Sequence, residues 1–424
     1  HEPALALRLA MPRPEAKSMF DAAVAAATGW AREITDTIHN GSLQRSLFLA
    51  ILVMLVVGVT TFLGAPHGAG TRAMLTPTVP AVALALLVLA AGLGVLRYHR
   101  HRLLALILTS VVGLVVSLTF VYFSAPDLGL TQLSVEIVTT VLMLLALNYL
   151  PQRTPREPST LRRWRDAAIA AVGGLAIGAT LYAVLTRDLP ATIASWHLAE
   201  SKPGGGGTNV VNVILVDFRG YDTFGEIIVL GIAALAIFAL LDSALAGASG
   251  RRLTTLSRRR EAGDRHPLML VVVTRALLPL ALTVGIYILL RGHNMPGGGF
   301  IAGLVIGVAL IMQYMASGYA WADQQMRIDY HAVIGVGVLV AGITGLGAWF
   351  GDLPFLTSGY DYFHLPLIGE IELATAMAFD LGVFLTVVGV VMLTLANLSR
   401  VGRKAEPQPV DAGPMDIVLP AEGR

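Results

Sequence analysis

The stretch that decides the fold is PDLGLTQLSVEIVTTVLMLLALNYLP, residues 126–151, which is long enough to cross a bilayer yet carries a carboxylate, Glu136, in its interior. At about 1.5 Å per residue, a helix from Gly129 to Leu150 spans the ~30 Å hydrocarbon layer and places Glu136 about two turns inside. An ionised group at that depth costs at least a few kcal/mol, so we expect Glu136 to face protein or water. Two interpretations stay open: a hydrogen-bonded glutamate that joins two helices, and a station in a proton or cation relay.

The composition of the whole chain indicates a membrane protein. Hydrophobic residues make up 55% of the 424 residues and charged residues only 14%, against about 25% charged residues in soluble domains. A water-soluble enzyme is therefore excluded. Cysteine is absent, which excludes disulfides, thiolate metal sites and iron–sulfur clusters on this chain.

Ten apolar runs are long enough to be transmembrane helices. The short loops between them are rich in arginine, and the basic turns at 97–102, 153–165 and 251–266 all fall in the cytoplasm if both termini of this chain are cytoplasmic. The predicted fold is therefore all-α, a polytopic membrane helix bundle of about ten transmembrane helices. The runs are 47–63, 79–96, 103–122, 129–150, 167–185, 224–245, 269–290, 300–317, 333–350 and 373–395.

The segments around these runs carry weaker signals. Residues 18–40 alternate apolar and polar groups at helical spacing, which predicts a lateral or interfacial amphipathic helix before the bundle. The stretches 186–208 and 352–372, rich in Pro, Gly or Asp, are predicted as loops, and 209–215 as a short re-entrant or interfacial turn. The tail 399–424 is polar and predicted to be disordered. Because no signal pattern opens the sequence, we expect the chain to begin inside a longer gene product.

The first candidate site lies on the run that contains Glu136. We interpret Asp127 as the entrance of an ion path, in the turn before the helix, and Glu136 as its interior station; for Asp127 alone, a helix cap is an equally good interpretation. Gln132, Thr139 and Thr140 lie three or four residues from Glu136, on its face. Such polar neighbours are what a buried carboxylate needs to be tolerated or to pass a proton.

A second acidic cluster opens the sixth run. Asp222 and Glu226 are four residues apart and therefore share a helix face, and Arg219 is close enough to hold one of them ionised. The alternative is a salt-bridged helix start, where acidic residues are favourable in any case.

Two opposite charges lie inside the last four runs, Arg275 and Asp380. We expect them to be shielded by each other or by partner subunits, because an isolated charge is expensive in lipid. The glycine run 297–299 permits a backbone turn at the membrane edge. His293 and His331 lack a second ligand at metal spacing, so no metal site is expected.

Three long strings resemble one known family. APDLGLTQLSVEIVTTVLMLLAL (125–147) and NVVNVILVDFRGYDTFGEI (209–227) are similar to the two small C-terminal modules of the large A subunit of Mrp-type multisubunit cation/proton antiporters. RGHNMPGGGFIAGL (291–304) is similar to the signature of their B subunit. The strings occur in the expected order, and the resemblance covers nearly the whole chain. The chain therefore resembles the C-terminal part of the A subunit fused to the B subunit.

The resemblance implies a subunit of a membrane complex that exchanges cytoplasmic Na⁺ for external H⁺, driven by the proton motive force, in the bacterial plasma membrane. Matched by motif, the ion-translocating acidic positions are Asp127, Glu136, Asp222 and Glu226, and Pro296 and Phe300 fall on the B-subunit signature. The full set of supporting candidates is Arg219, Gln132, Thr140, Arg275, Asp380, Pro296 and Phe300. The large antiporter-like bundle with its lysine and glutamate proton channel is missing, so this chain alone is not expected to be a complete antiporter.

The same resemblance implies the partners and the domains. The partners are the antiporter-like and small membrane subunits of the complex and the lipid bilayer; no nucleic acid, no enzymatic activity, and no cofactor or metal beyond the transported Na⁺ and H⁺ are expected. We expect a lateral helix and the last helix of the antiporter-like region (1–75), modules related to the J-type subunit of complex I (76–247), a basic cytoplasmic linker (248–267), a four-helix domain like the B subunit (268–398) and a polar cytoplasmic tail (399–424).

Two other functions remain open. The chain is a scaffold that clamps the pumping subunits together and carries no ion, or it belongs to the membrane arm of a hydrogenase or oxidoreductase related to complex I, with which it shares modules.

Overall fold

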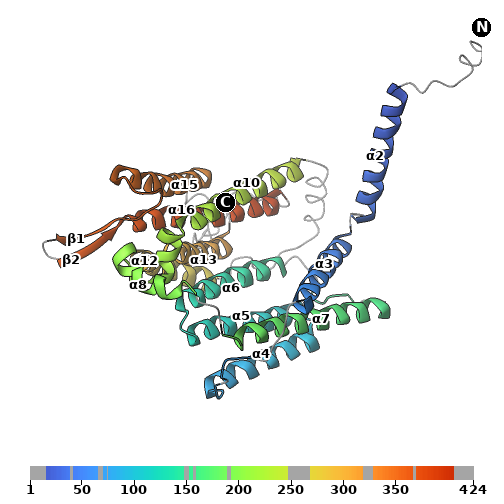
Figure 1. Ribbon diagram of the computed structural model, residues 1–424, viewed down its shortest axis with the longest axis horizontal. Coiled ribbons are helices and arrows are strands. Elements are labelled where there is room, and N and C mark those ends of the chain that lie inside the picture. Colours follow the sequence, from blue (N-terminus) through green and yellow to red (C-terminus); the bar gives the residue numbers. More distant parts are fainter. Residues whose placement is uncertain are drawn as a thin grey trace, which may run out of the picture. The chain divides into compact units, whose positions relative to one another are not determined.

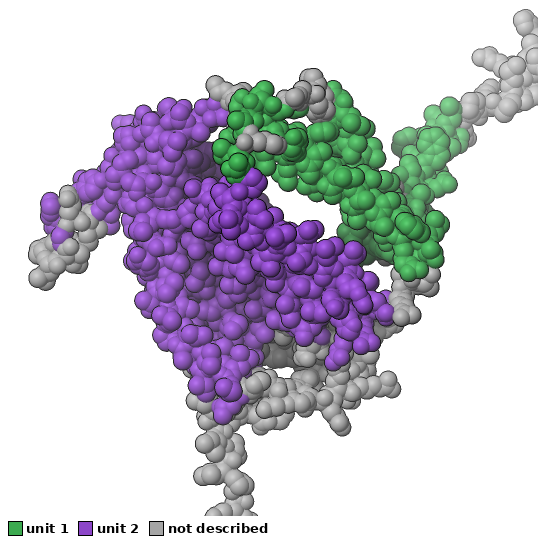
Figure 2. All heavy atoms as spheres, turned by 90° about the horizontal axis from the view of Figure 1, so that it is seen from below, with its two compact units in different colours: residues 1–76, 156–190 green, residues 77–155, 191–424 purple. Residues whose placement is uncertain are grey.

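The computed structural model describes residues 16–38, 42–64, 70–73, 75–147, 152–155, 159–188, 192–246, 268–318, 328–365 and 369–404. These residues form two compact units, coloured separately in Figure 2. Unit 1 consists of residues 1–76 and 156–190, and unit 2 of residues 77–155 and 191–424. The basic linker expected at 248–267 lies outside the described residues, and the domain division stays a prediction.

The described part of unit 1 forms three helices, α2 (Ala16–Ile38), α3 (Leu43–Gly64) and α7 (Thr160–Leu185) (Figure 1). Gly173 of α7 lies beside α3, where a Cβ would be in ordinary van der Waals contact with a methyl group of Leu55 at 3.6 Å. The helix predicted at 18–40 is present as α2. Its side chains are exposed on every face, and its place in the interface stays a prediction.

Unit 2 is a bundle of long apolar helices around α13 and α16, the two that are most buried (Figure 1). Glycines on α13 give α16 its close approach: a Cβ on Gly303 would lie 2.9 Å from Val387, and one on Gly307 would lie 3.2 Å from Val391. Such small residues are what allows helices to pack tightly in a membrane. The helices are α4 (Val79–Tyr98), α5 (Arg102–Tyr122), α6 (Pro126–Leu147), α10 (Gly220–Ala246), α12 (Leu268–Arg291), α13 (Gly299–Ser317), α15 (Tyr330–Gly347) and α16 (Thr375–Lys404).

Among the described residues, ten helices are long enough and apolar enough to cross a membrane. This confirms the all-α polytopic fold. One boundary is corrected at a site residue: α6 begins at Pro126, so Asp127 lies in the first helical turn and not in the preceding turn. The end of the last helix was also predicted too early, because α16 continues through Lys404 into the segment expected to be disordered.

The loop predicted at 186–208 contains a helix, α8 (Ala194–Gly205). Tertiary contacts override its Pro and Gly content: Trp196 packs its ring 5.0 Å from that of Phe218, and Lys202 forms a salt bridge of 2.8 Å with Glu372. Gly206 then ends the helix with φ 76°, a left-handed conformation that glycine adopts at little cost. The turn predicted at 209–215 is a helical segment, α9 (Val210–Val213), followed by one π-helical turn, η1 (Ile214–Phe218).

The prediction of a loop at 352–372 was also wrong in part. Its second half forms an antiparallel hairpin of β1 (Tyr360–Leu365) and β2 (Gly369–Ala374), which extends away from the helices (Figure 1). The register pairs Tyr360 with Ala374 and Phe363 with Ile371. In the sequence, the Asp and Pro residues next to the aromatic residues predicted a loop. The alternation of aromatic and polar groups instead favours a strand.

Candidate functional site

Two buried carboxylates, Asp127 on α6 and Asp380 on α16, lie at the two ends of one polar network in unit 2. Their residues are 7% and 6% exposed. Both carboxylates are held by asparagine amides from the short segment 209–213, which links α8 to α10. Segments that are far apart in the sequence therefore meet at this network.

Asp127 is bound by two donors. Its Oδ1 accepts a hydrogen bond from Nδ2 of Asn209 (3.2 Å) and another from the backbone nitrogen of Gly297 (3.0 Å). A buried carboxylate is tolerated when such donors replace its water. Asp127 thus joins α6 to the glycine loop after α12, a contact that its position in the sequence does not suggest.

Asn209 ties the same loop from the other side. Its Nδ2 lies 3.0 Å from the carbonyl oxygen of Gly292 and 3.1 Å from that of Met295, and its backbone nitrogen donates to the carbonyl oxygen of His293 (3.2 Å). The expected turn at the glycine run is present, and Gly298 adopts φ 105°, where a side chain would be strained. The loop is therefore fixed by Asn209 on one side and by Asp127 on the other.

Asn212 reaches the second carboxylate. Its Nδ2 donates to Oδ2 of Asp380 over 3.1 Å, while its Oδ1 is buried with no partner among the described residues. A Cβ on Gly298 would lie 2.8 Å from this Nδ2 and 3.3 Å from Oδ2 of Asp380. Glycine at 298 thus makes room for the amide and the carboxylate to meet.

The sequence suggested that Asp380 and Arg275 could shield each other. Among the described residues no ion pair joins these two side chains, and Asp380 instead accepts a hydrogen bond from the amide of Asn212. An amide donor partly offsets the burial of a carboxylate without adding a second charge. Arg275 is half-buried on α12, and its shielding by partner subunits stays a prediction.

The side chain of Glu136, on α6, lies against α5. It is half-buried, and its carboxylate occupies the space that a side chain at Gly113 of α5 would fill. Thr140, expected to support it, instead pairs its hydroxyl with that of Ser110 (2.6 Å). Gln132 is half-buried on the same helix. Glu136 is therefore positioned against another helix, as expected, but none of the described residues donates a hydrogen bond to it.

The cluster at the start of α10 is more exposed than the first. Arg219 and Asp222 form an ion pair, with side chains 66% and 49% exposed, and Glu226 is also exposed. Asp217, to which the sequence assigned no role, is better placed: its Oδ1 accepts a hydrogen bond from the backbone nitrogen of Ser358 (3.1 Å), and burial raises its pKa. The spacing of Asp222 and Glu226 thus predicted a shared region of the helix and did not predict its exposure.

A second polar group borders the glycine loop. Nζ of Lys202 binds Glu372, and Nδ2 of Asn294 donates to the same carboxylate (3.2 Å). Desolvation lowers the pKa of Lys202, and hydrogen bonds to Glu372 and Tyr362 outweigh it, so the pKa lies above its usual value. Burial lowers the pKa of His293, which is 4% exposed, and this effect outweighs the nearby charge of Glu372 and a contact with the backbone of Gly205, which both raise the pKa.

The two asparagines are what reasoning from the sequence missed. They lie three residues apart in NVVNV, an apolar β-branched run, and polar amides in such a run are a signal of buried hydrogen bonding. Of the B-subunit signature, Pro296 is half-buried in the glycine loop and Phe300 is 36% exposed at the start of α13. Both flank the network, and neither contributes a polar group to it.

Three family models match successive parts of the chain. They describe the D subunit of MBH (residues 83–152), the E subunit of MBH (residues 161–248) and a domain related to the MnhB subunit of Na⁺/H⁺ antiporter (residues 269–393). Together they match the order of modules expected from the sequence.

The individual relatives are named as antiporter subunits. The A/B subunit of a probable K⁺/H⁺ antiporter of Rhizobium meliloti (strain 1021) is 41% identical over 88% of this chain and 39% of its own length. The B subunit of a Na⁺/H⁺ antiporter of Bacillus subtilis (strain 168) is 37% identical over 32% of this chain and 94% of its own length. Among solved structures, a chain of the Mrp complex from Dietzia sp. DQ12-45-1b matches 95% of this chain and 43% of its own length, with a TM-score of 0.74 and 30% identity. The chain thus spans about two fifths of the longer proteins that it matches.

Proposed function

Because this chain belongs to the family of Mrp-type multisubunit antiporter subunits, with the C-terminal part of the A subunit joined to the B subunit, we propose that its intramembrane carboxylates line part of an ion path. In this proposal the complete complex exchanges cytoplasmic Na⁺ for external H⁺, driven by the proton motive force. The partners are the antiporter-like and small membrane subunits, and the chain is not itself an enzyme.

The observation that carries the proposal is the polar network that runs from Asp127 to Asp380. Two buried carboxylates lie on helices that bury little else that is charged, and carboxylates inside membrane helices mark ion and proton pathways by default. Among the described residues, each accepts a hydrogen bond from an asparagine amide and neither forms an ion pair. Such a site binds a cation or proton weakly enough to release it, which transport requires.

Glu136 has a different place in this path. Its carboxylate lies in the gap that Gly113 leaves between α5 and α6, and without a fixed donor it is able to exchange a proton or a hydrated cation with its surroundings. Asp222 and Glu226, both exposed, form the outer mouth in this proposal, with Asp222 paired to Arg219.

The orientation follows from the arginines. With both termini of this chain in the cytoplasm of the plasma membrane, the basic segments after α4 and before α7 lie on the cytoplasmic side, as the positive-inside rule requires. The names of the relatives divide between K⁺ and Na⁺. Carboxylate and amide oxygens bind either cation. We therefore propose Na⁺ from the family resemblance alone, and replacing Na⁺ with K⁺ in the exchange measurement tests it.

A scaffold function is the second candidate, and one observation favours it. Asn209 and Asp127 together bind Gly292, Met295 and Gly297, so they lock the A-subunit part of the chain to its B-subunit part. A group that is needed only for this lock affects transport through assembly alone. The two functions therefore differ in what a carboxylate-neutralising variant does to an intact complex.

Asp380→Asn separates the two functions. It retains the shape and an acceptor oxygen for Asn212 but removes the ionisable group. We expect cation-dependent proton exchange in everted vesicles to fall at least tenfold while a native gel shows the assembled complex. The matched control is Asp352→Asn, an exposed aspartate with φ 55° that Asn adopts readily. Unchanged exchange in Asp380→Asn would contradict an ion path through this group, and a dissociated complex would support the scaffold.

A further inference from the structure

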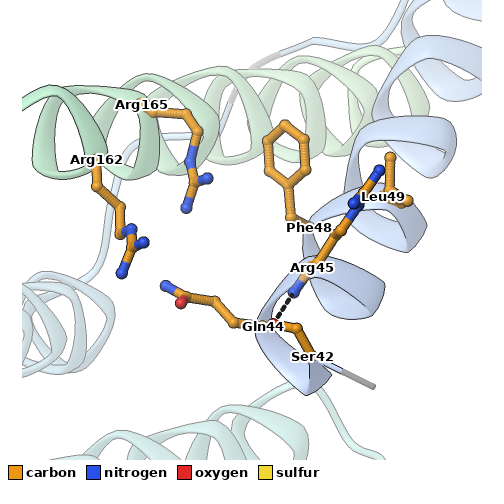
Figure 3. Close-up of a pocket in the computed structure, with 7 residues that line it drawn as sticks. All are labelled: Ser42, Gln44, Arg45, Phe48, Leu49, Arg162 and Arg165. Carbon is orange, nitrogen blue, oxygen red and sulfur yellow. Dashed lines mark hydrogen bonds between the residues drawn. The ribbon is translucent and has the colours of Figure 1, made fainter. Parts of the chain in front are cut away.

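An arginine-lined hollow lies within unit 1, where α3 and α7 begin (Figure 3). It has a volume of about 460 Å³ and is separate from the carboxylate network, which belongs to unit 2. None of the candidate ion-path residues lines it. The lining residues are Ser42, Gln44, Arg45, Phe48, Leu49, Arg162 and Arg165.

The hollow is lined by basic and apolar side chains: Arg162 and Arg165 come from α7, and Arg45, Phe48 and Leu49 come from α3. Figure 3 shows Arg162 and Arg165 extending from α7 toward the amide of Gln44 on α3. The guanidinium of Arg165 lies 4.7 Å from the centre of the Phe48 ring and binds Asp166 through Nε (2.9 Å) and Nη2 (2.7 Å), so its position is fixed. Among the described residues, three arginines and no acidic side chain line the hollow, and Asp166 beside it pairs with Arg165.

The hollow also lies at the level of lipid headgroups. Both helices are membrane spans that begin here, so the hollow marks the boundary between water and hydrocarbon. Trp164, next to Arg165, is 73% exposed, and exposed tryptophans are typical of this boundary. The first turns of α3 and α7 add their own positive partial charge to that of the arginines.

We propose that this hollow binds the phosphate of an anionic phospholipid. One guanidinium group can donate two parallel hydrogen bonds to the oxygens of a phosphate. Basic hollows between transmembrane helices are suited to acidic headgroups. The amide of Gln44 supplies a further donor, and the acyl chains lie along Phe48, Leu49 and the exposed apolar surface of α3, whose Leu52 and Val53 are 39% and 61% exposed. The site anchors unit 1 in the membrane and is independent of the ion path.

The test uses the complete complex in nanodiscs of phosphatidylcholine that contain a minor fraction of phosphatidylglycerol with a photoreactive group beside its phosphate. After illumination, mass spectrometry locates the labelled peptides. Wild type is expected to carry the label on residues 42–49 and 159–165. Arg162→Gln is expected to reduce this labelling roughly fivefold, the effect of one arginine near an anionic lipid surface. Arg163→Gln, the adjacent arginine that is exposed and does not line the hollow, is expected to retain most of the labelling.

Three results would overturn the proposal. Equal labelling by a phosphatidylcholine probe would mean that the headgroup charge is not recognised. Equal losses in Arg162→Gln and Arg163→Gln would mean that only the general surface charge matters. Loss of labelling on addition of excess inorganic phosphate at constant ionic strength would identify a site for free phosphate and not for a lipid.

Discussion

The amide of Asn212 donates to the carboxylate of Asp380 over 3.1 Å, and this bond joins the part of the chain related to the A subunit to the part related to the B subunit. Both groups are buried. A carboxylate in this position has lost its water and depends on a small number of fixed donors. The asparagine therefore helps to hold Asp380, together with the backbone of Gly299, although it is uncharged and lies 168 residues away in the sequence.

Removing the amide tests this dependence. Asn212→Ala leaves Oδ2 of Asp380 without its donor, and the cost of an unsatisfied buried acceptor is about 1–3 kcal/mol. We expect a lower thermal unfolding temperature of the purified complex. Val211→Ala, in the same segment but 41% exposed, is the control and should change stability by less than about 0.5 kcal/mol. Equal effects of the two substitutions would mean that the bond adds nothing to stability.

A side chain at Gly298 should disturb the same bond. Gly298→Ala places a Cβ 2.8 Å from Nδ2 of Asn212 at a φ of 105°, and such backbone strain costs roughly 1–3 kcal/mol. The expected results are lower complex stability and weaker exchange. Gly335→Ala is the matched control, because a Cβ there has no neighbour within 4 Å and Gly335 lies within α15. A stable, active Gly298→Ala variant would contradict the tight packing of the loop.

Gly113 controls the space that Glu136 occupies. Gly113→Ala places a methyl group where the carboxylate lies, so Glu136 must move or α5 must shift away from α6. If Glu136 carries ions, exchange should fall at least threefold while the complex remains assembled. Gly92→Ala on α4, where a Cβ meets nothing within 4 Å, should leave exchange unchanged. Full exchange in Gly113→Ala would show that the position of Glu136 is not critical.

The lowered pKa of His293 predicts that the stability of the complex depends on pH. Burial lowers its pKa in the folded protein, whereas in the unfolded chain it is about 6.5. The unfolded state therefore binds more protons below that pH, and stability falls as pH drops from about 7 through 6.5 toward the lower folded pKa. Thermal unfolding of wild type and His293→Gln between pH 7.5 and pH 5.5 measures it. The variant should lose less stability on acidification, and parallel curves would contradict the assignment.

Prediction from the sequence succeeded where hydrophobic length decides the structure. All ten spans are present among the described helices, since a run of about twenty apolar residues leaves few alternatives. It failed where tertiary contacts decide. Helix α8 depends on the packing of Trp196 against Phe218, and the hairpin on the pairing of β1 with β2 and on the salt bridge between Glu372 and Lys202.

The candidate site was predictable only in part, for the same reason. Asp127 and Asp380 stand out because a charge in an apolar run is costly, but their partners are amides that any loop could carry. Asn209 and Asn212 become visible only when the fold brings them to the glycine loop. The exposure of Glu226 was equally hidden, because helical spacing shows which residues share a face and not what that face meets.

If carboxylates on this chain take part in ion movement, neutralising Glu136 should stop exchange. The measurement is pH-gradient-driven Na⁺ exchange in everted vesicles that contain the whole complex with Glu136→Gln, with a native gel for assembly. We expect exchange to be lost while the complex stays intact, because the amide fills the same space but does not titrate. Exchange at the wild-type rate, or loss of exchange only through dissociation of the complex, would contradict it.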